Sequence, residues 1–185
     1  MRGRVAHWRS DERGSTAVEM ALLSGIMVMV TAGAVEAGFA YHQHGNAQHA
    51  VRHGARLAAL GDPVSVLAAE TSGRFTVECF GDTQRCSRGG FDAAAFQRLY
   101  SGADGDNACG QTTRDRQGMC DVMEALDADD LVVRYSRERE GEHALVTVTV
   151  RQRPLRTVAY GPLLPQTFRT LPSVSATMTG GDLDG

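Results

Sequence analysis

The sequence contains no lysine, and its 19 basic residues are all arginine. Its 22 acidic residues outnumber them, and the formal net charge is −3 at pH 7. Proteins that bind nucleic acid usually carry a basic surplus that neutralises phosphates, and this chain has none. We therefore expect no nucleic-acid partner. A hydrophobic content of 42% and a charged content of 22% are ordinary for a folded protein, which argues against wholesale disorder.

The sequence also lacks the short motifs of common hydrolytic and nucleotide chemistry. No GxSxG, HExxH or phosphate-binding P-loop pattern occurs. His143 and the scattered acids form no recognisable catalytic set. We therefore expect no enzyme activity and no cofactor, and an exported enzyme is the weakest of three functional hypotheses.

A stretch without basic residues runs from Ala17 to Tyr41 and holds only two acids, Glu19 and Glu36. A helix of this length would be about 37 Å long. The hydrocarbon core of a bilayer needs about 20 residues, so the stretch is long enough to span it. The first 14 residues hold four arginines against two acids, which favours a cytoplasmic N-terminus and an exported remainder.

A cleaved secretory signal is the alternative interpretation of this stretch. Ala32-Gly33-Ala34 could pass for its small-residue cleavage site. However, the apolar region of a signal peptide is about 7–15 residues long. Glu19 stands at the head of the stretch, where a carboxylate costs free energy and becomes a functional candidate. A solvated Glu19 at the headgroup level, close to Arg13, is the simplest alternative role. We favour a spanning helix.

The residues around Gly14 resemble the cleavage site of type IV prepilins, in which a membrane aspartic peptidase cuts after glycine. In GSTAVE, residues 14–19, the acid falls at the fifth position of the mature chain. More narrowly, RGSTAVEMAL (13–22) and AQHAVRHGAR (47–56) are similar to TadE-like minor pseudopilins of the tight-adherence, or Flp-type, pilus. The resemblance covers residues 13–60 well, and the rest of the chain loosely or hardly at all. One departure is Met20, where the family usually has an aromatic residue.

This resemblance implies processing between Gly14 and Ser15, and an assembly role for Glu19. Cleavage would free the α-amino group of Ser15, which could pair with Glu19 of a neighbouring subunit in a helix bundle. The implied partners are other pilin or pseudopilin subunits, the prepilin peptidase, the inner-membrane assembly platform and membrane lipid. The chain would be a single-pass protein of the bacterial inner membrane. The alternative is a membrane-anchored periplasmic binding domain that does not polymerise. Small residues suited to helix packing recur at every fourth position in two runs, Ala17, Ala21 and Gly25, and then Ala34 and Gly38.

Helical periodicity continues beyond the apolar stretch, and Gly61-Asp62-Pro63 is a strong stop signal. We therefore predict one helix from about Ser15 to Leu60. The chain divides into a basic cytoplasmic leader, the transmembrane half of the helix, its extracytoplasmic extension and an extracytoplasmic α+β domain: residues 1–14, 15–41, 42–60 and 61–185.

Two sets of candidate metal-binding residues are better explained without a metal. The helix extension carries His42, His44, His49 and His53, an incomplete ligand set that we interpret as a polar face near the membrane. Asp104 and Asp106 could hold calcium through carboxylate oxygens, but the loop lacks the rest of a calcium-binding pattern. Asp and Gly are also ordinary turn residues, and a turn is our interpretation.

All four cysteines follow the apolar stretch, as in an exported protein. Cys79, Cys86, Cys109 and Cys120 allow three disulfide pairings, and the sequence does not choose among them. No CxxC spacing occurs. Free buried thiols would be preferred only if the predicted topology were wrong.

Alternating and helical patterns predict a small domain after the helix. The expected strands cover 131–136, 144–150 and 173–179, with a hairpin at 137–142, and short helices are expected at 92–100 and 119–126. The predicted fold class is α+β, with a long N-terminal, partly transmembrane helix packed on a small antiparallel β-sheet. It is pilin-like and stapled by disulfides.

Overall fold

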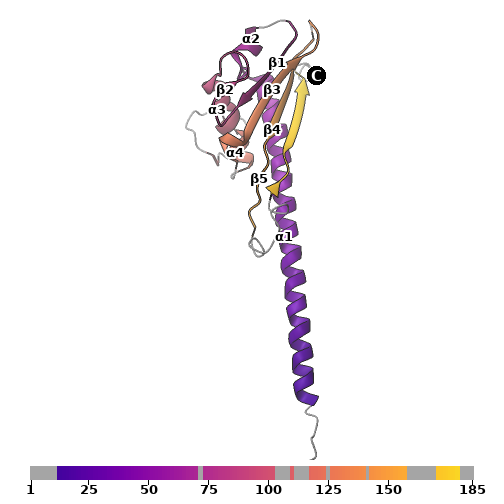
Figure 1. Ribbon diagram of the computed structural model, residues 1–185. Helices are drawn as coiled ribbons and strands as arrows, with labels where there is room; N and C mark the ends of the chain where they lie inside the picture. The colour runs from indigo at the N-terminus through magenta and orange to yellow at the C-terminus, as the bar shows by residue number, and fades with distance from the viewer. Residues whose placement is uncertain are drawn as a thin grey trace, which may run out of the picture.

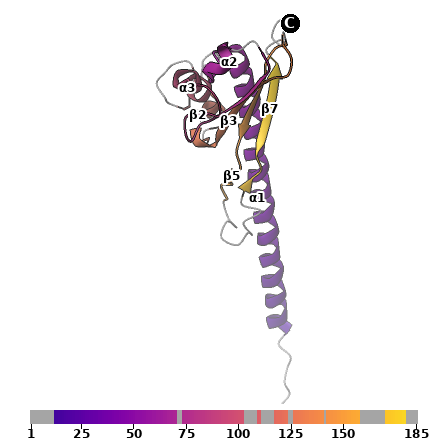
Figure 2. The ribbon, with the colours of Figure 1, turned by 45° about the horizontal axis from the view of Figure 1, so that its top comes forward.

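The computed structural model describes residues 12–70, 73–102, 109–110, 117–123, 126–140, 142–157 and 170–179. Its longest element is helix α1 (Glu12–Leu60), with 49 residues. A small domain packs around the C-terminal half of α1, and the N-terminal half projects away from it (Figures 1 and 2). The helix ends at Leu60, as predicted: Gly61 N–H donates to Leu57 O at 2.9 Å, and Pro63 follows.

The domain is built on a five-stranded antiparallel sheet with the order β2-β1-β3-β4-β7. The strands are β1 (Phe75–Phe80), β2 (Arg85–Cys86), β3 (Leu131–Arg137), β4 (Leu145–Val150) and β7 (Val174–Thr179). A separate pair, β5 (Arg153–Pro154) and β6 (Thr170–Leu171), lies outside this sheet. The predicted α+β fold class is confirmed, and so are the three predicted strands. Strand β1 was not predicted, although Phe75, Val77 and Cys79 alternate with more exposed residues.

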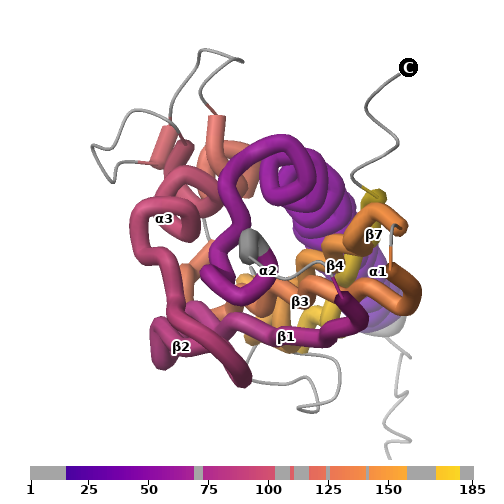
Figure 3. Tube along the Cα trace, turned by 90° about the horizontal axis from the view of Figure 1, so that it is seen from above, coloured from indigo at the N-terminus to yellow at the C-terminus, as the bar shows by residue number. Residues whose placement is uncertain are grey.

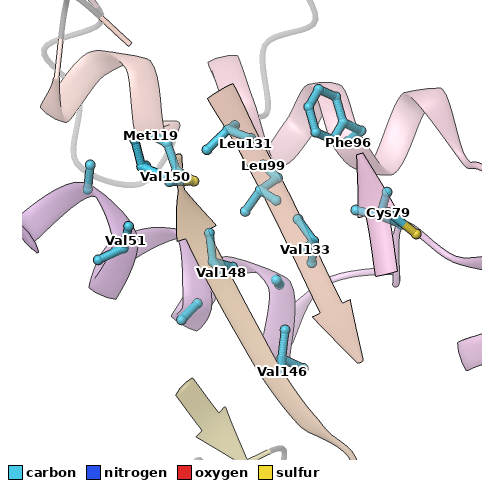
Figure 4. Packing of buried hydrophobic residues seen from close by; sticks show 14 of the residues in the cluster. Val51, Cys79, Phe96, Leu99, Met119, Leu131, Val133, Val146, Val148 and Val150 are labelled. Carbon is cyan, nitrogen blue, oxygen red and sulfur yellow. The ribbon is translucent and has the colours of Figure 1, made fainter. Parts of the chain in front are cut away.

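One face of the sheet packs on α1, as the alternation in each strand predicts. Val77, Val133 and Val148 are fully buried on this face. Figure 4 shows Val148 and Val133 on neighbouring strands, with Val51 of α1 close by. On the opposite face, Thr147 and Thr177 are cross-strand partners whose hydroxyl groups lie 2.9 Å apart. The core therefore lies between the sheet and the second half of α1, as the view along the helix also shows (Figure 3).

Within the described part of the domain there are three short α-helices: α2 (Val66–Glu70), α3 (Ala93–Ser101) and α4 (Met119–Val122). Asp92 caps α3, because its Oδ1 accepts the N–H groups of Ala94 at 2.9 Å and Ala95 at 3.0 Å. This confirms the helix predicted at 92–100. The helix predicted at 119–126 is too long, because Met123 leaves helical geometry with a φ of −135°. Its N–H still donates to Met119 O, which closes the last turn of α4.

Buried Tyr135 ties the sheet to the segment after α1. Its side-chain oxygen accepts the N–H of Val64 at 3.0 Å, so a buried backbone donor is satisfied. Tyr135 is 2% exposed. Burial of its phenol raises its pKa to about 12, against the smaller opposing effect of the Val64 hydrogen bond.

Small residues bring the extension of α1 close to the rest of the domain. Ala47, Ala50 and Ala55 are fully buried. Gly54 lies directly against Met119 of α4, and a Cβ at position 54 would overlap the Met119 side chain, with only 2.8 Å to its Cγ. Gly45, two and a half turns earlier, has open space where its Cβ would be.

We expect replacement by alanine to have opposite effects on the stability of the domain at these two glycines. Gly54→Ala should destabilise the domain by about 1–3 kcal/mol, because the buried Met119 side chain must move. Gly45→Ala should stabilise it by about 0.5–1 kcal/mol, because alanine loses less conformational entropy in a helix. Urea denaturation of the two full-length variants in the same detergent measures both effects. Equal midpoints for the two variants would contradict the close packing of α1 on α4.

Candidate functional site

The N-terminal half of α1 exposes its apolar side chains. From Thr16 onward α1 is long and apolar enough to cross a membrane, and the apolar window that meets this criterion is entirely unburied by the rest of the protein. Val18, Leu22 and Ile26 are about 60% exposed. Apolar surface of this extent does not remain in water on a soluble monomer. It is the surface that a bilayer, or a bundle of similar helices, would cover.

Glu19 lies on this exposed half, one turn after the predicted cleavage site. Gly14 and Ser15 both fall in the first turn of α1, and their side chains lie outside the described part of the structure. Glu19 is exposed and follows Ser15 by four residues, which is about 6 Å along a helix axis. The backbone therefore places the predicted new N-terminus and the carboxylate at the same end of the apolar helix.

The small residues form two patches on different sides of α1. Ala17, Ala21 and Gly25 fall within roughly 80° around the helix. Around the helix, Ala34 lies about 180° and Gly38 about 140° from Gly25. All five are exposed or half-exposed, and a Cβ at Gly25 or Gly38 would meet nothing within 4 Å. Both patches are therefore open to close approach by another helix.

Three histidines of the helix extension contact neighbouring polar groups. His42 and His44 contact the amide side chains one turn later, those of Asn46 at 3.2 Å and Gln48 at 2.9 Å. His53 lies 2.8 Å from the carbonyl oxygen of Gln117. Among the described residues, no group of three or more His, Cys, Asp or Glu side chains is placed to hold a metal ion. Asp104 and Asp106 lie outside the described residues.

The four cysteines form two disulfides, Cys79–Cys86 and Cys109–Cys120. The first joins β1 to β2, where the two cysteines are cross-strand partners with their Cα atoms 3.9 Å apart. The second ties buried Cys120 of α4 to exposed Cys109. The pairing that the sequence left open is thus the sequential one, and each disulfide closes a short loop.

Charged side chains at the base of the sheet interact across strands and loops. Arg151 donates to Asp82 at 2.8 Å, and this hydrogen bond lowers the pKa of the Asp82 carboxyl. Asp130 lies 3.8 Å from Arg153. Partial burial raises the pKa of Asp130, and the positive charge of Arg153 opposes that effect.

Sequence reasoning did not find the contact between Gln43 and Arg156, which are 113 residues apart. Gln43 Nε2 donates to Arg156 O at 2.8 Å, and Arg156 N–H donates to Gln43 Oε1 at 3.0 Å. The side chain of Gln43 thus pairs with a backbone unit as a neighbouring strand would. No local signal in the sequence predicts so distant a pairing.

The fold and the exposed helix together define a class: an α+β domain carried on a long helix whose free half is fit to span a membrane. The comparison with known families is more specific. Residues 14–56 match the model of the family described as TadE-like protein. This confirms the resemblance inferred from the helix residues, and the match begins at Gly14. No curated protein and no solved structure matches the chain.

Proposed function

We propose that this protein is a minor pseudopilin, a structural or assembly subunit of a Tad/Flp-type adhesive pilus, with no catalysis of its own. It is inserted in the bacterial inner membrane with its N-terminus in the cytoplasm, and prepilin peptidase cleaves it after Gly14. One observation carries the proposal: the TadE-like segment is a continuous helix that exposes an apolar surface with Glu19 near its start.

The geometry of α1 supports assembly through helix packing. Glu19 lies about 160° around the helix from Ala21, which is the middle residue of the first small patch. One helix can therefore offer Glu19 to one neighbour and the small patch to another. Head-to-tail interfaces of this kind, in which the two partners use different surfaces, generate open helical filaments when the rotation between subunits does not close a ring. An isologous dimer would use a single self-complementary surface instead.

A charge pair between subunits would fix the axial register of the assembled helices. Cleavage after Gly14 creates an ammonium group at Ser15, and Glu19 of the neighbour is its proposed partner. In an apolar bundle an unpaired ammonium or carboxylate is costly, so only registers that pair them are favourable. Packing of small residues alone would leave the axial position less well defined.

The disulfides support an exported domain. Both pairs lie beyond the apolar half of α1, and disulfides persist in oxidising compartments such as the periplasm. The arginines of residues 1–14 favour retention of that end in the cytoplasm. The proposed partners are other pilin or pseudopilin subunits, prepilin peptidase and the inner-membrane assembly platform.

Fractionation of cells that make the pilus tests the proposal. The chain should appear in sheared surface fibres or in a detergent-stable complex with other subunits, and only when prepilin peptidase is present. An anchored binding domain that does not polymerise would instead stay in the membrane fraction, free of other subunits. The anchored binding domain is favoured if the chain is distributed among the fractions in the same way with and without prepilin peptidase.

A further inference from the structure

A polar cavity lies where the domain meets the free half of α1. Its volume is about 460 Å³. Phe39, His42 and Gln43 line it from α1, and Arg153 and Arg156 line it from the segment that follows β4. This is the membrane-facing end of the domain, where β5 lies beside α1 in both side views (Figures 1 and 2).

The cavity lies at the height of lipid headgroups if α1 spans a bilayer. A hydrocarbon core of about 30 Å takes about 20 helical residues, which reach Gly38 when Glu19 marks the cytoplasmic border. The next five residues, through Gln43, rise by about 7 Å, comparable to the thickness of one headgroup layer. Tyr41 is 81% exposed at this level, as expected of an aromatic residue at a membrane interface.

The arginines are held in place by the protein. The two hydrogen bonds between the Gln43 side chain and the backbone of Arg156 fix that backbone against α1. The side chain of Arg153 is only 15% exposed and forms an ion pair with Asp130. Arg156, in contrast, is an exposed residue of the cavity lining.

One acid, Asp121, also lines the cavity, and its carboxylate accepts hydrogen bonds from two backbone N–H groups. Asp121 accepts the N–H of Gly110 at 2.6 Å through Oδ1 and the N–H of Gly118 at 2.7 Å through Oδ2. The described lining residues thus include two guanidinium groups and one imidazole, but only one carboxylate. Arginine suits a phosphate diester, because its planar guanidinium donates two parallel hydrogen bonds.

We propose that this cavity binds the headgroup of an anionic phospholipid in the leaflet that faces the domain. Arg156 would donate to the lipid phosphate, with Arg153 and His42 behind it and Phe39 against the upper acyl chain. Bound lipid would hold the domain upright on the membrane before assembly. The inference rests on the membrane-spanning part of the proposed function and is independent of cleavage and polymerisation.

Native mass spectrometry of the full chain in detergent, titrated with phosphatidylglycerol or phosphatidylcholine, tests the site. The wild type should bind phosphatidylglycerol in preference to phosphatidylcholine. Arg156→Gln should weaken phosphatidylglycerol binding about fivefold, as expected for one arginine near an anionic membrane surface. Arg156→Lys keeps the charge but loses the two parallel hydrogen bonds, so its loss of affinity should be smaller than that of Arg156→Gln but measurable. Arg85→Gln, the same charge change on β2, is the matched control and should have no effect.

Several outcomes would overturn the proposal. Equal binding of the two lipids by the wild type, or an equal loss with Arg85→Gln and Arg156→Gln, would exclude a specific headgroup site. Displacement of the lipid by millimolar inorganic phosphate would mean that the cavity binds free phosphate. Recovery of the chain in the soluble fraction of cells would overturn the proposed function and the lipid site together. A membrane-inserted chain without lipid preference would overturn the lipid site alone.

Discussion

Glu19→Ala should insert into the membrane normally but fail to enter fibres. Removing the acid leaves the Ser15 ammonium of the neighbouring subunit without a partner in an apolar bundle. Breaking a buried ion pair in this way costs about 3–5 kcal/mol, a loss of about two to nearly four orders of magnitude in association. Glu19→Gln should behave in the same way, because it keeps the size of the side chain and removes its charge. Comparison of the variants in the membrane and sheared-fibre fractions measures the effect.

Glu36 provides the matched control for this substitution. It is the other acid of the apolar stretch and lies toward the opposite end of the spanning segment. Glu36→Gln removes the same charge and should retain most of the incorporation into fibres. Normal incorporation of Glu19→Ala, or an equal defect in both variants, would contradict the pairing of Ser15 with Glu19.

Loss of the Cys79–Cys86 disulfide should lower the stability of the domain. The double variant Cys79→Ala, Cys86→Ala should lower the free energy of unfolding by about 2–4 kcal/mol, since the short loop between β1 and β2 is no longer closed in the unfolded chain. For a protein of this size that corresponds to about 2–4 °C in Tm for each kcal/mol. Thermal unfolding of the full chain in detergent measures the change.

The disulfide also protects one edge of the sheet. Strand β2 covers the outer edge of β1 with only two residues, and the disulfide joins the two strands at one of their two paired positions. Without it, β1 would present unpaired backbone groups to other chains, so aggregation should accompany the loss of stability. An unchanged Tm, together with an unchanged monomer fraction, would contradict this role. The variant Cys109→Ala, Cys120→Ala separates the effect of this disulfide from that of the other.

The long helix and three strands could be predicted because their signals are local. The Gly61-Asp62-Pro63 stop follows the helical pattern directly, and alternation in 144–150 and 173–179 shows which face is buried. The short helix at 92–100 begins after Asp92, a good capping residue. These features depend on neighbouring residues, which a single sequence shows.

The remaining features depend on contacts between distant residues. Buried and more exposed residues alternate along strand β1, as in the predicted strands. Its position between β2 and β3 depends on the order of strands in the sheet, which no local sequence pattern predicts. The choice among disulfide pairings follows from the β1–β2 register, which places Cys79 opposite Cys86. The cavity beneath the domain depends on Gln43 meeting Arg156, a contact that exists only after the sheet has packed on α1. The assembly site at Glu19 stays a prediction, and its signal is local, because the cleavage motif and the acid lie within six residues.

The mature N-terminus tests the central claim most directly. Intact mass of the membrane-extracted protein, from cells with and without its prepilin peptidase, identifies the first residue of the chain. A chain that begins at Ser15 only when the peptidase is present is the predicted result and establishes processing as a prepilin. A chain that begins at Met1 in both cells would contradict the account and favour an anchored domain, and one that begins near Val35 would mean a secreted protein.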